Sequence, residues 1–230
     1  MVESRCGIRC SECEYLKNGQ CKGLCVNIDK PFWGDSCPVK DCCEAKNYEH
    51  CGECGSFPCD LLNEFAYDKE QGDDGKRLQT CLMWAAGFDA EKFISAVAAQ
   101  DAKSLQGFFV PDAIICWHDS NEQFTVAEYI RANCEYPGCA GEQHPQGAAS
   151  PGNWNGEIQR VEKSSTGMVL LTKIFSDDFT TFVTAFITLK DGKITHLDEY
   201  YADYNCEIPQ WRKDMNIGRP IPLGSGELNE

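Results

Sequence analysis

The sequence predicts an α+β protein in two parts. Eleven of the 16 cysteines fall within the first 59 residues, and the other five are scattered through the rest of the chain. Behind this segment, apolar residues at helical spacing come first and four alternating, strand-like segments come last. Helices followed by consecutive strands favour helices packed on one face of a curved antiparallel sheet. We expect a cysteine-rich domain at 1–70, a helical connector at 71–88 and a larger domain at 89–230.

Composition limits the partners and the compartment. The 230 residues carry a net charge of -15, which argues against nucleic acid or an anionic membrane surface as partner. No apolar run approaches the ~20 residues that cross a bilayer, and the N-terminus shows no secretory signal. We therefore expect a cytoplasmic protein without a nucleic-acid or membrane partner. A hydrophobic content of 42% is enough for a core.

The N-terminal cysteines have the spacing of metal ligands. The stretches 10–13 and 51–54 are CxxC motifs, in which a tight turn lets two thiolates reach one ion. Disulfides are disfavoured without an export signal, and no CxxC lies in the βαβ context of a thioredoxin-type couple. The expected ligands form two sets, although interleaved pairing fits the spacing equally well: Cys10, Cys13, Cys21 and Cys25, and Cys37, Cys42, Cys51 and Cys54.

Structural zinc is the expected occupant, with an iron–sulfur cluster as the alternative. The first 60 residues are poor in apolar side chains, so a small domain there needs a source of stability other than hydrophobic burial, such as a bound metal ion. Thiolates suit both kinds of metal centre. The spacing Cys6-x3-Cys10-x2-Cys13 is typical of a radical-SAM cluster, but the remaining chain does not resemble the barrel associated with that chemistry. Alternate ligands are Cys6, Cys43, Cys59 and His50.

The order "CGIRCSEC … CKGLC … CPVKDCCEAKNYEHCGECGSFPCDLL" carries a family resemblance. Over residues 5–62 the chain resembles the cysteine-rich prokaryotic domain-of-unknown-function family numbered thirty-seven ninety-five, and "CxECxxFPC" is the most specific part. The resemblance implies metal binding and no particular activity.

Two short helices are expected to follow the cysteines. Pro58 suits a first helical turn, and an apolar stripe of Leu61, Leu62 and Phe65 continues that helix until "QGDDG" breaks it at 71–75. The second helix ends near Gly87 and has an apolar face at i, i+3, i+4 and i+7, formed by Leu78, Cys81, Leu82 and Ala85. Cys81 is therefore expected in the core.

The larger domain begins with helical signals. Asp89 can cap a helix that runs to about residue 105. The stretch "PDAIICWHD" then alternates as a strand, with Trp117 on one face and Cys116 on the other. "TVAE" at 125–128 is a capping box that starts a helix at Val126. Strands are expected at about 156–163, 167–176, 179–190 and 193–202, with "KDGK" as the last hairpin turn.

This order, together with "FITLKDGKITHLDEYYADYNCEIPQWR", resembles the nuclear transport factor two-like superfamily over about residues 88–215, and its SnoaL-like branch in particular. The resemblance implies a cone-shaped, curved antiparallel sheet with helices on its concave face around an apolar pocket. Such a pocket would take a small hydrophobic or carbonyl-bearing ligand. The superfamily contains isomerases, dehydratases, cyclases and non-catalytic binders, so the resemblance names no reaction.

Strict alternation along 194–201 sorts the candidate site residues by face. By the resemblance, the face of Ile194 points to the core, so that His196, Asp198 and Tyr200 would line the cavity. If the protein is an enzyme, we predict metal-free acid–base chemistry of the isomerase or dehydratase type, with Asp198 as the base and His196 or Tyr200 assisting. The predicted pocket walls are Trp117, Tyr136, Trp154 and Tyr200.

The alternative hypothesis is a non-catalytic protein. A His–Asp pair two residues apart on a strand is often a satisfied hydrogen-bonded pair. In this reading the outer sheet face, with Leu197 and Tyr201, forms a homodimer, while the cysteine module senses redox state or holds an iron–sulfur cluster. A pocket without a buried ionisable group would favour binding over catalysis.

Overall fold

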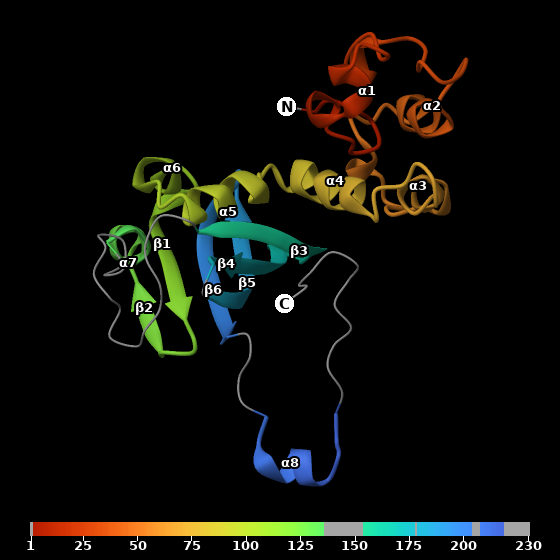
Figure 1. Ribbon diagram of the computed structural model, residues 1–230. Coiled ribbons are helices and arrows are strands. Elements are labelled where there is room, and N and C mark those ends of the chain that lie inside the picture. The colour runs from red at the N-terminus through yellow and green to blue at the C-terminus, as the bar shows by residue number, and fades with distance from the viewer. Residues whose placement is uncertain (1, 136–153, 178, 204–207, 219–230) are drawn as a thin grey trace.

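The computed structural model describes residues 2–135, 154–177, 179–203 and 208–218 (Figure 1). No helix within these ranges is both long enough and apolar enough to span a bilayer. The elements in chain order are η1 Cys10–Glu12, α1 Glu14–Lys17, η2 Cys25–Asn27, α2 Pro38–Ala45, η3 Cys51–Glu53, α3 Asp60–Ala66, α4 Lys76–Ala86, α5 Ala90–Ala98, α6 Ala102–Gln106, β1 Phe109–Trp117, β2 Glu122–Phe124, α7 Val126–Cys134, β3 Asn155–Lys163, β4 Gly167–Phe175, β5 Thr180–Lys190, β6 Lys193–Asp203 and α8 Gln210–Asp214.

The sheet has six strands in the order β2-β1-β6-β5-β4-β3. Strand β1 runs parallel to β6, and every other neighbouring pair is antiparallel. The predicted α+β class and the last four strands are confirmed, and the short strand β2 is an addition to the prediction. The turn between β5 and β6 uses Asp191 and Gly192 at φ 51° and 71°, as a tight hairpin requires.

The helices of the larger domain begin at the predicted caps. The carboxylate of Asp89 accepts from the backbone N–H of Lys92 at the start of α5, and the Thr125–Glu128 capping box is formed at the start of α7. The single helix predicted to about residue 105 is wrong, because the chain breaks at Gln100, where φ is 53°. A new helix, α6, follows with Asp101 as its N-cap.

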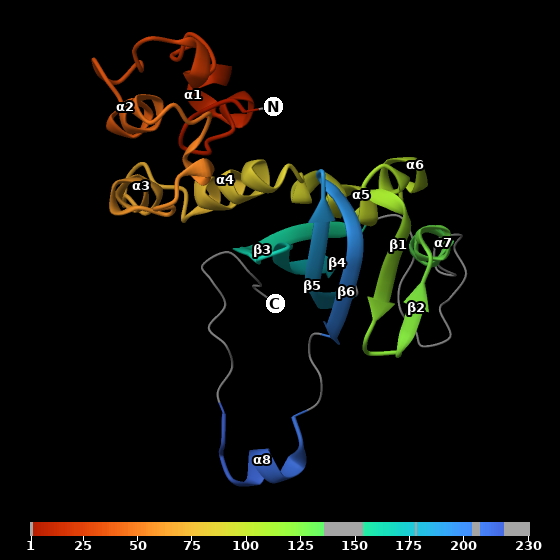
Figure 2. The same ribbon diagram turned by 180° about the vertical axis from the view of Figure 1, so that it is seen from behind.

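One hydrophobic core lies between α5, α6, α7 and the sheet face that they cover, which we call the inner face (Figures 1 and 2). The opposite side is the outer face. Helix α5 packs against β3, and α7 packs against β1. The core includes Phe93, Leu105, Ile115, Tyr129, Leu170, Ile187, Ile194 and Leu197. The curvature into a cone stays a prediction.

A bulge in β6 decides which side chains face the core. On β5, Thr188 pairs with His196 and its neighbour Leu189 pairs with Ile194, so Thr195 is an extra residue on β6. An extra residue reverses the alternation. Ile194 and Leu197 are therefore both fully buried, although an odd number of positions separates them. The predicted orientation of 195–201 is wrong for this reason.

The N-terminal segment packs on α4, which buries Cys81 completely, as predicted. The backbone of Gly7 and Gly52 approaches the carbonyl groups of Arg77 and Cys81, too closely for a side chain at either glycine. A charged contact extends to α5, where the Arg9 guanidinium lies 2.9 Å from the Glu91 carboxylate. The first sixty residues are thus anchored to the helices that lead into the larger domain.

Candidate functional site

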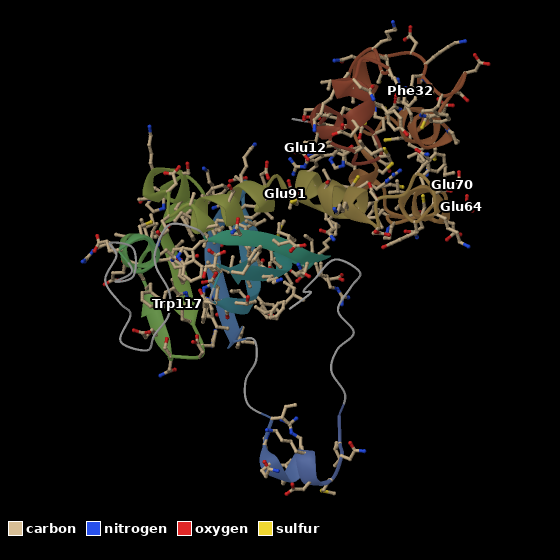
Figure 3. All side chains as sticks on the ribbon, viewed as in Figure 1. Glu12, Phe32, Glu64, Glu70, Glu91 and Trp117 are labelled. Atoms are coloured by element: carbon tan, nitrogen blue, oxygen red, sulfur yellow. The ribbon has the colours of Figure 1, made fainter. Side chains whose placement is uncertain are left out.

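A buried carboxylate lies on the inner face of β6. Glu199 is only 5% exposed, and it follows Leu197 on the inward side of the strand. The indole Nε1 of Trp117 donates to its Oε2 at 2.7 Å, and the hydroxyl of Tyr201 donates to the same oxygen at 3.1 Å. Trp117 comes from β1, two strand positions beyond Ile115 on the same face (Figure 3). The site therefore joins two paired strands.

Burial raises the pKa of Glu199 to about 7, against an ordinary value of 4.5. Hydrogen bonds from Trp117, Tyr201 and Tyr129 act in the opposite direction, because they stabilise the charged form. Burial and the nearby carboxylate also raise the pKa of Tyr129 and of Tyr201, so both phenols keep their protons near neutral pH. Within the described chain no cation forms an ion pair with Glu199.

Aromatic rings surround this carboxylate. Trp117 packs against Phe124, with ring centroids 4.6 Å apart, and contacts Tyr129 and Tyr201 at 6.2 and 5.6 Å. Among the described residues, Trp117 is the predicted pocket residue that reaches this cluster. We call Trp117, Tyr129, Glu199 and Tyr201 the Glu199 cluster. Its polar atoms sit among apolar rings, an arrangement that can hold a carbonyl oxygen and move a proton.

The predicted catalytic pair lies on the other side of the sheet. His196 and Asp198 project from the outer face, with side chains 38% and 28% exposed, and Tyr200 is 45% exposed. The Nε2 atom of His196 lies 3.1 Å from the Asp198 carboxylate. These residues do not line the core, and the prediction that they face inward is wrong because of the bulge at Thr195.

The outer-face residues predicted for a dimer are also placed differently. Leu197 is fully buried, and Tyr201 belongs to the Glu199 cluster. The large apolar side chains that the outer face exposes are Ile114, Phe186 and Tyr200.

Two further residues are predicted to line the pocket. Trp154 precedes β3 and packs edge-on against Phe179, with centroids 5.8 Å apart. Tyr136 lies outside the described residues. A shallow cavity of about 550 Å³ lies between α5, α6 and the β5–β6 turn, and none of its lining residues belongs to the Glu199 cluster.

Five thiols line a small cavity of about 20 Å³ in the N-terminal segment. They are Cys42, Cys43, Cys51, Cys54 and Cys59, with the aliphatic wall completed by Leu62. The ammonium group of Lys46 lies 3.7 Å from the sulfur of Cys54. Three of the four ligands predicted for the second set are therefore together, and the alternates Cys43 and Cys59 join them. Cys37 does not line this cavity.

The first predicted set is more dispersed. The sulfur of Cys10 accepts from the backbone N–H of Cys25 at 3.4 Å, whereas the thiol of Cys21 donates to the Gly23 carbonyl at 3.3 Å. Burial raises the pKa of Cys10 to about 11. No three N-terminal cysteines in the described chain have sulfur atoms within 4.8 Å of one another. His50, an alternate ligand, accepts at Nδ1 from the N–H of Gly52.

Sequence alone missed Glu199 and the clustering of thiols from α2, η3 and the N-cap of α3. The signal for Glu199 was present, because Ile194 and Leu197 cannot share a face on a regular strand. Two strongly apolar residues at odd spacing indicate a bulge between them.

One protein family matches the N-terminal part of the chain. Residues 2–64 match a family described as a protein of unknown function (DUF3795). No curated protein matches the chain.

Solved structures cover the C-terminal part of the chain. One is an NTF-2 like protein of unknown function from Burkholderia xenovorans, with 18% identity over 58% of this chain and 92% of that chain and a TM-score of 0.43. A second, from Catenulispora acidiphila, has a ketosteroid isomerase-like fold and bound trimethylamine, with 11% identity over 49% and 84% and a TM-score of 0.40.

A third is an LEH-like epoxide hydrolase from M. tuberculosis, with 12% identity over 49% of this chain and 79% of that chain and a TM-score of 0.37. The chain thus joins an N-terminal segment that matches DUF3795 to a C-terminal α+β domain similar to NTF2-like proteins.

Proposed function

We propose that the C-terminal domain binds a small carbonyl-bearing, largely hydrophobic molecule at the Glu199 cluster and transfers a proton on it, as in an isomerase or dehydratase. The observation that carries this proposal is geometric. A carboxylate is buried on the inner face, has no cationic partner among the described residues, and is held by aromatic donors. A buried charge that lacks an opposite charge is expensive, and such groups concentrate at functional sites.

Each member of the cluster has a separate role in this reaction. Glu199 takes a proton from the carbon next to the carbonyl group, and the electron pair of that C–H bond moves onto the carbonyl oxygen. As Glu199 takes up this proton, the hydroxyl of Tyr201 or Tyr129 turns from the Glu199 carboxylate to the substrate and donates to the carbonyl oxygen, where negative charge develops. Trp117 donates to Glu199 and fixes the orientation of its carboxylate. The proton is then returned to a different carbon in isomerisation, or leaves with a hydroxyl group as water in dehydration.

Deuterium exchange into simple ketones tests this proton transfer directly. Cyclohexanone and cyclohex-2-enone are incubated with the full-length protein in D₂O, and deuterium at the carbon next to the carbonyl is followed by NMR. We expect the wild-type protein to accelerate exchange and Glu199→Gln to lower the rate constant about 10²- to 10⁴-fold. Tyr201→Phe is expected to have a smaller effect.

The matched control is Glu157→Gln, which neutralises an exposed carboxylate on β3. Its exchange rate should equal that of the wild-type protein. Equal rates for Glu199→Gln and the wild-type protein, or no acceleration by the wild-type protein with either ketone, would contradict the proposal. Asp198→Asn separates the two faces, because a loss of exchange there would return the acid–base role to the outer face.

We infer that the N-terminal segment is stabilised by bound metal, with zinc as the expected ion. The supporting observation is the cavity of about 20 Å³ lined by five thiols, a donor set that suits thiophilic ions. Metal analysis of anaerobically purified protein is expected to find tightly bound zinc. Removing it with a chelator should abolish protection of amides in α2 and α3 from hydrogen exchange while the sheet stays protected. An ordered, metal-free N-terminal segment would contradict this inference.

A further inference from the structure

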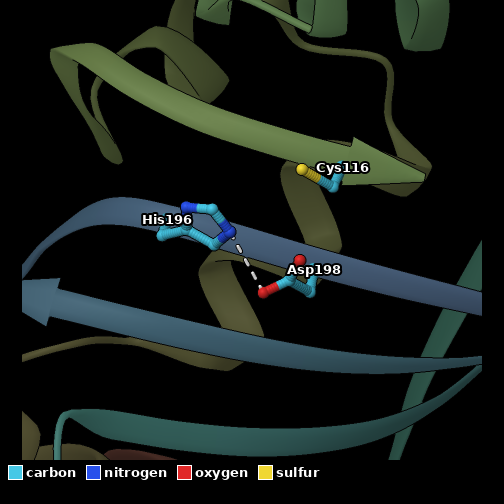
Figure 4. A group of neighbouring side chains, drawn as sticks. All are labelled: Cys116, His196 and Asp198. Carbon is cyan, nitrogen blue, oxygen red and sulfur yellow. Dashed lines mark ion pairs between the residues drawn. The ribbon is translucent and has the colours of Figure 1, made fainter. Parts of the chain in front are cut away.

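The outer face of the sheet carries a second group of metal-ligating side chains, far from the N-terminal cysteines in sequence. The ligand atoms of Cys116, His196 and Asp198 all lie within 4.8 Å of one another, and this is the one such group among the described residues (Figure 4). We propose that these three residues bind one divalent transition-metal ion of the zinc class. The proposal does not rest on the Glu199 cluster, which lies on the opposite face.

Two features of the backbone bring the three ligands together. Strands β1 and β6 are parallel, and their register sets Cys116 beside Asp198 and Ile114 beside His196. The bulge at Thr195 turns His196 and Asp198 outward, onto the face where Cys116 already points. Ligands on two paired strands are held by the hydrogen-bond ladder and need little ordering when an ion arrives.

The donor set selects the class of metal. A thiolate, an imidazole and a carboxylate together suit zinc, cobalt or another late first-row ion, whereas Mg²⁺ and Ca²⁺ require oxygen ligands throughout. Three protein ligands leave a fourth tetrahedral position for water or an external ligand.

His118 is a positioning residue for this site. Its Nε2 lies 2.7 Å from Oδ1 of Asp198, while His196 approaches the other carboxylate oxygen at 3.1 Å. The ring of His118 is stacked on Tyr200, with centroids 4.4 Å apart and planes 3° apart. Because His118 contacts Oδ1 of Asp198, it fixes the orientation of the carboxylate and leaves Oδ2 directed at the ion.

Fold stability does not account for the arrangement. All three ligands are partly exposed, and ion pairs at exposed positions contribute little to the free energy of unfolding. The net charge of -15 favours a cation at the surface.

The test counts metal in the full-length, reduced protein, and it compares variants because the N-terminal cysteines are expected to bind zinc as well. The protein is dialysed against buffered Zn²⁺ under anaerobic conditions, and zinc per chain is measured by mass spectrometry. We expect Cys116→Ser and His196→Ala each to bind one equivalent less than the wild-type protein. Asp112→Asn, which removes an exposed carboxylate on β1, should bind the wild-type amount. Equal counts in all four proteins would overturn the proposal.

A second measurement guards against indirect effects on folding. In the wild-type protein, Zn²⁺ should shift the ring ¹⁵N resonances of His196, and millimolar Mg²⁺ should not compete. His118→Ala should keep the stoichiometry but weaken affinity about 10- to 100-fold, and His118→Gln, which retains a donor, should restore part of it. Ring resonances of His196 that do not respond to Zn²⁺ would also refute the site.

Discussion

Replacing Gly7 with alanine is expected to destabilise the contact between the N-terminal segment and α4 by about 3 kcal/mol. Gly7 has φ 94°, a conformation that L side chains rarely adopt, and an added Cβ would lie 2.0 Å from the carbonyl oxygen of Arg77. Steric strain and backbone strain therefore act together. Amide hydrogen exchange of residues 76–86 measures the effect locally, since a two-part chain need not unfold in one step.

Gly19→Ala is the matched control for this change. Gly19 has φ 78°, but nothing lies within 4 Å of the position of its Cβ. Only the backbone strain remains, and we expect a loss of about 1 kcal/mol with normal exchange in α4. Equal amide hydrogen exchange in α4 for the two variants would contradict the close contact between Gly7 and this helix.

Replacing Glu199 with glutamine is expected to change stability in a pH-dependent way. The pKa of Glu199 is about 7 in the folded protein and near 4.5 in an exposed chain. The folded protein therefore binds a proton that the unfolded chain has released between these pH values, and stability falls as pH rises from 4.5 to 7. Above pH 7 the wild-type protein should be up to about 3 kcal/mol less stable than Glu199→Gln.

Urea denaturation at pH 4.5 and pH 8 measures this difference. The other groups that face Glu199 are Trp117, Tyr129 and Tyr201, with the charge of Asp119 further away. The two phenols stay protonated across this range, because their pKa values lie well above 10. Comparison of the two proteins at each pH cancels groups elsewhere in the chain. A pH-independent difference would contradict a buried, proton-binding Glu199.

Local signals were sufficient for most of the sheet and its caps. The Thr125–Glu128 box fixes the start of α7, and Asp191-Gly192 fixes the last hairpin, because each satisfies its own backbone groups within four residues. The break at Gln100 was not predictable in this way. Apolar spacing continues across 93–105, and only the cap at Asp101 separates the helices.

The prediction of the candidate site from the sequence is wrong because of a single inserted residue. Regular alternation from Ile194 onwards predicts the wrong face for the following residues, because the bulge at Thr195 exchanges the inward-facing and outward-facing side chains. His196 and Asp198 do contact each other, but they do so on the outer face, together with Cys116. For the cysteines, CxxC spacing does not predict which thiols lie together, because the cavity combines residues of α2, η3 and the N-cap of α3 that belong to different motifs.

The bulge at Thr195 turns the Glu199 carboxylate into the core, where it can carry a proton near neutral pH. The most direct measurement is the pH titration of the Glu199 side-chain carboxyl carbon by ¹³C NMR in the full-length protein, with Glu199→Gln to assign the resonance. The structure predicts a midpoint near pH 7. A midpoint near 4.5, the value of a solvent-exposed glutamate, would contradict it.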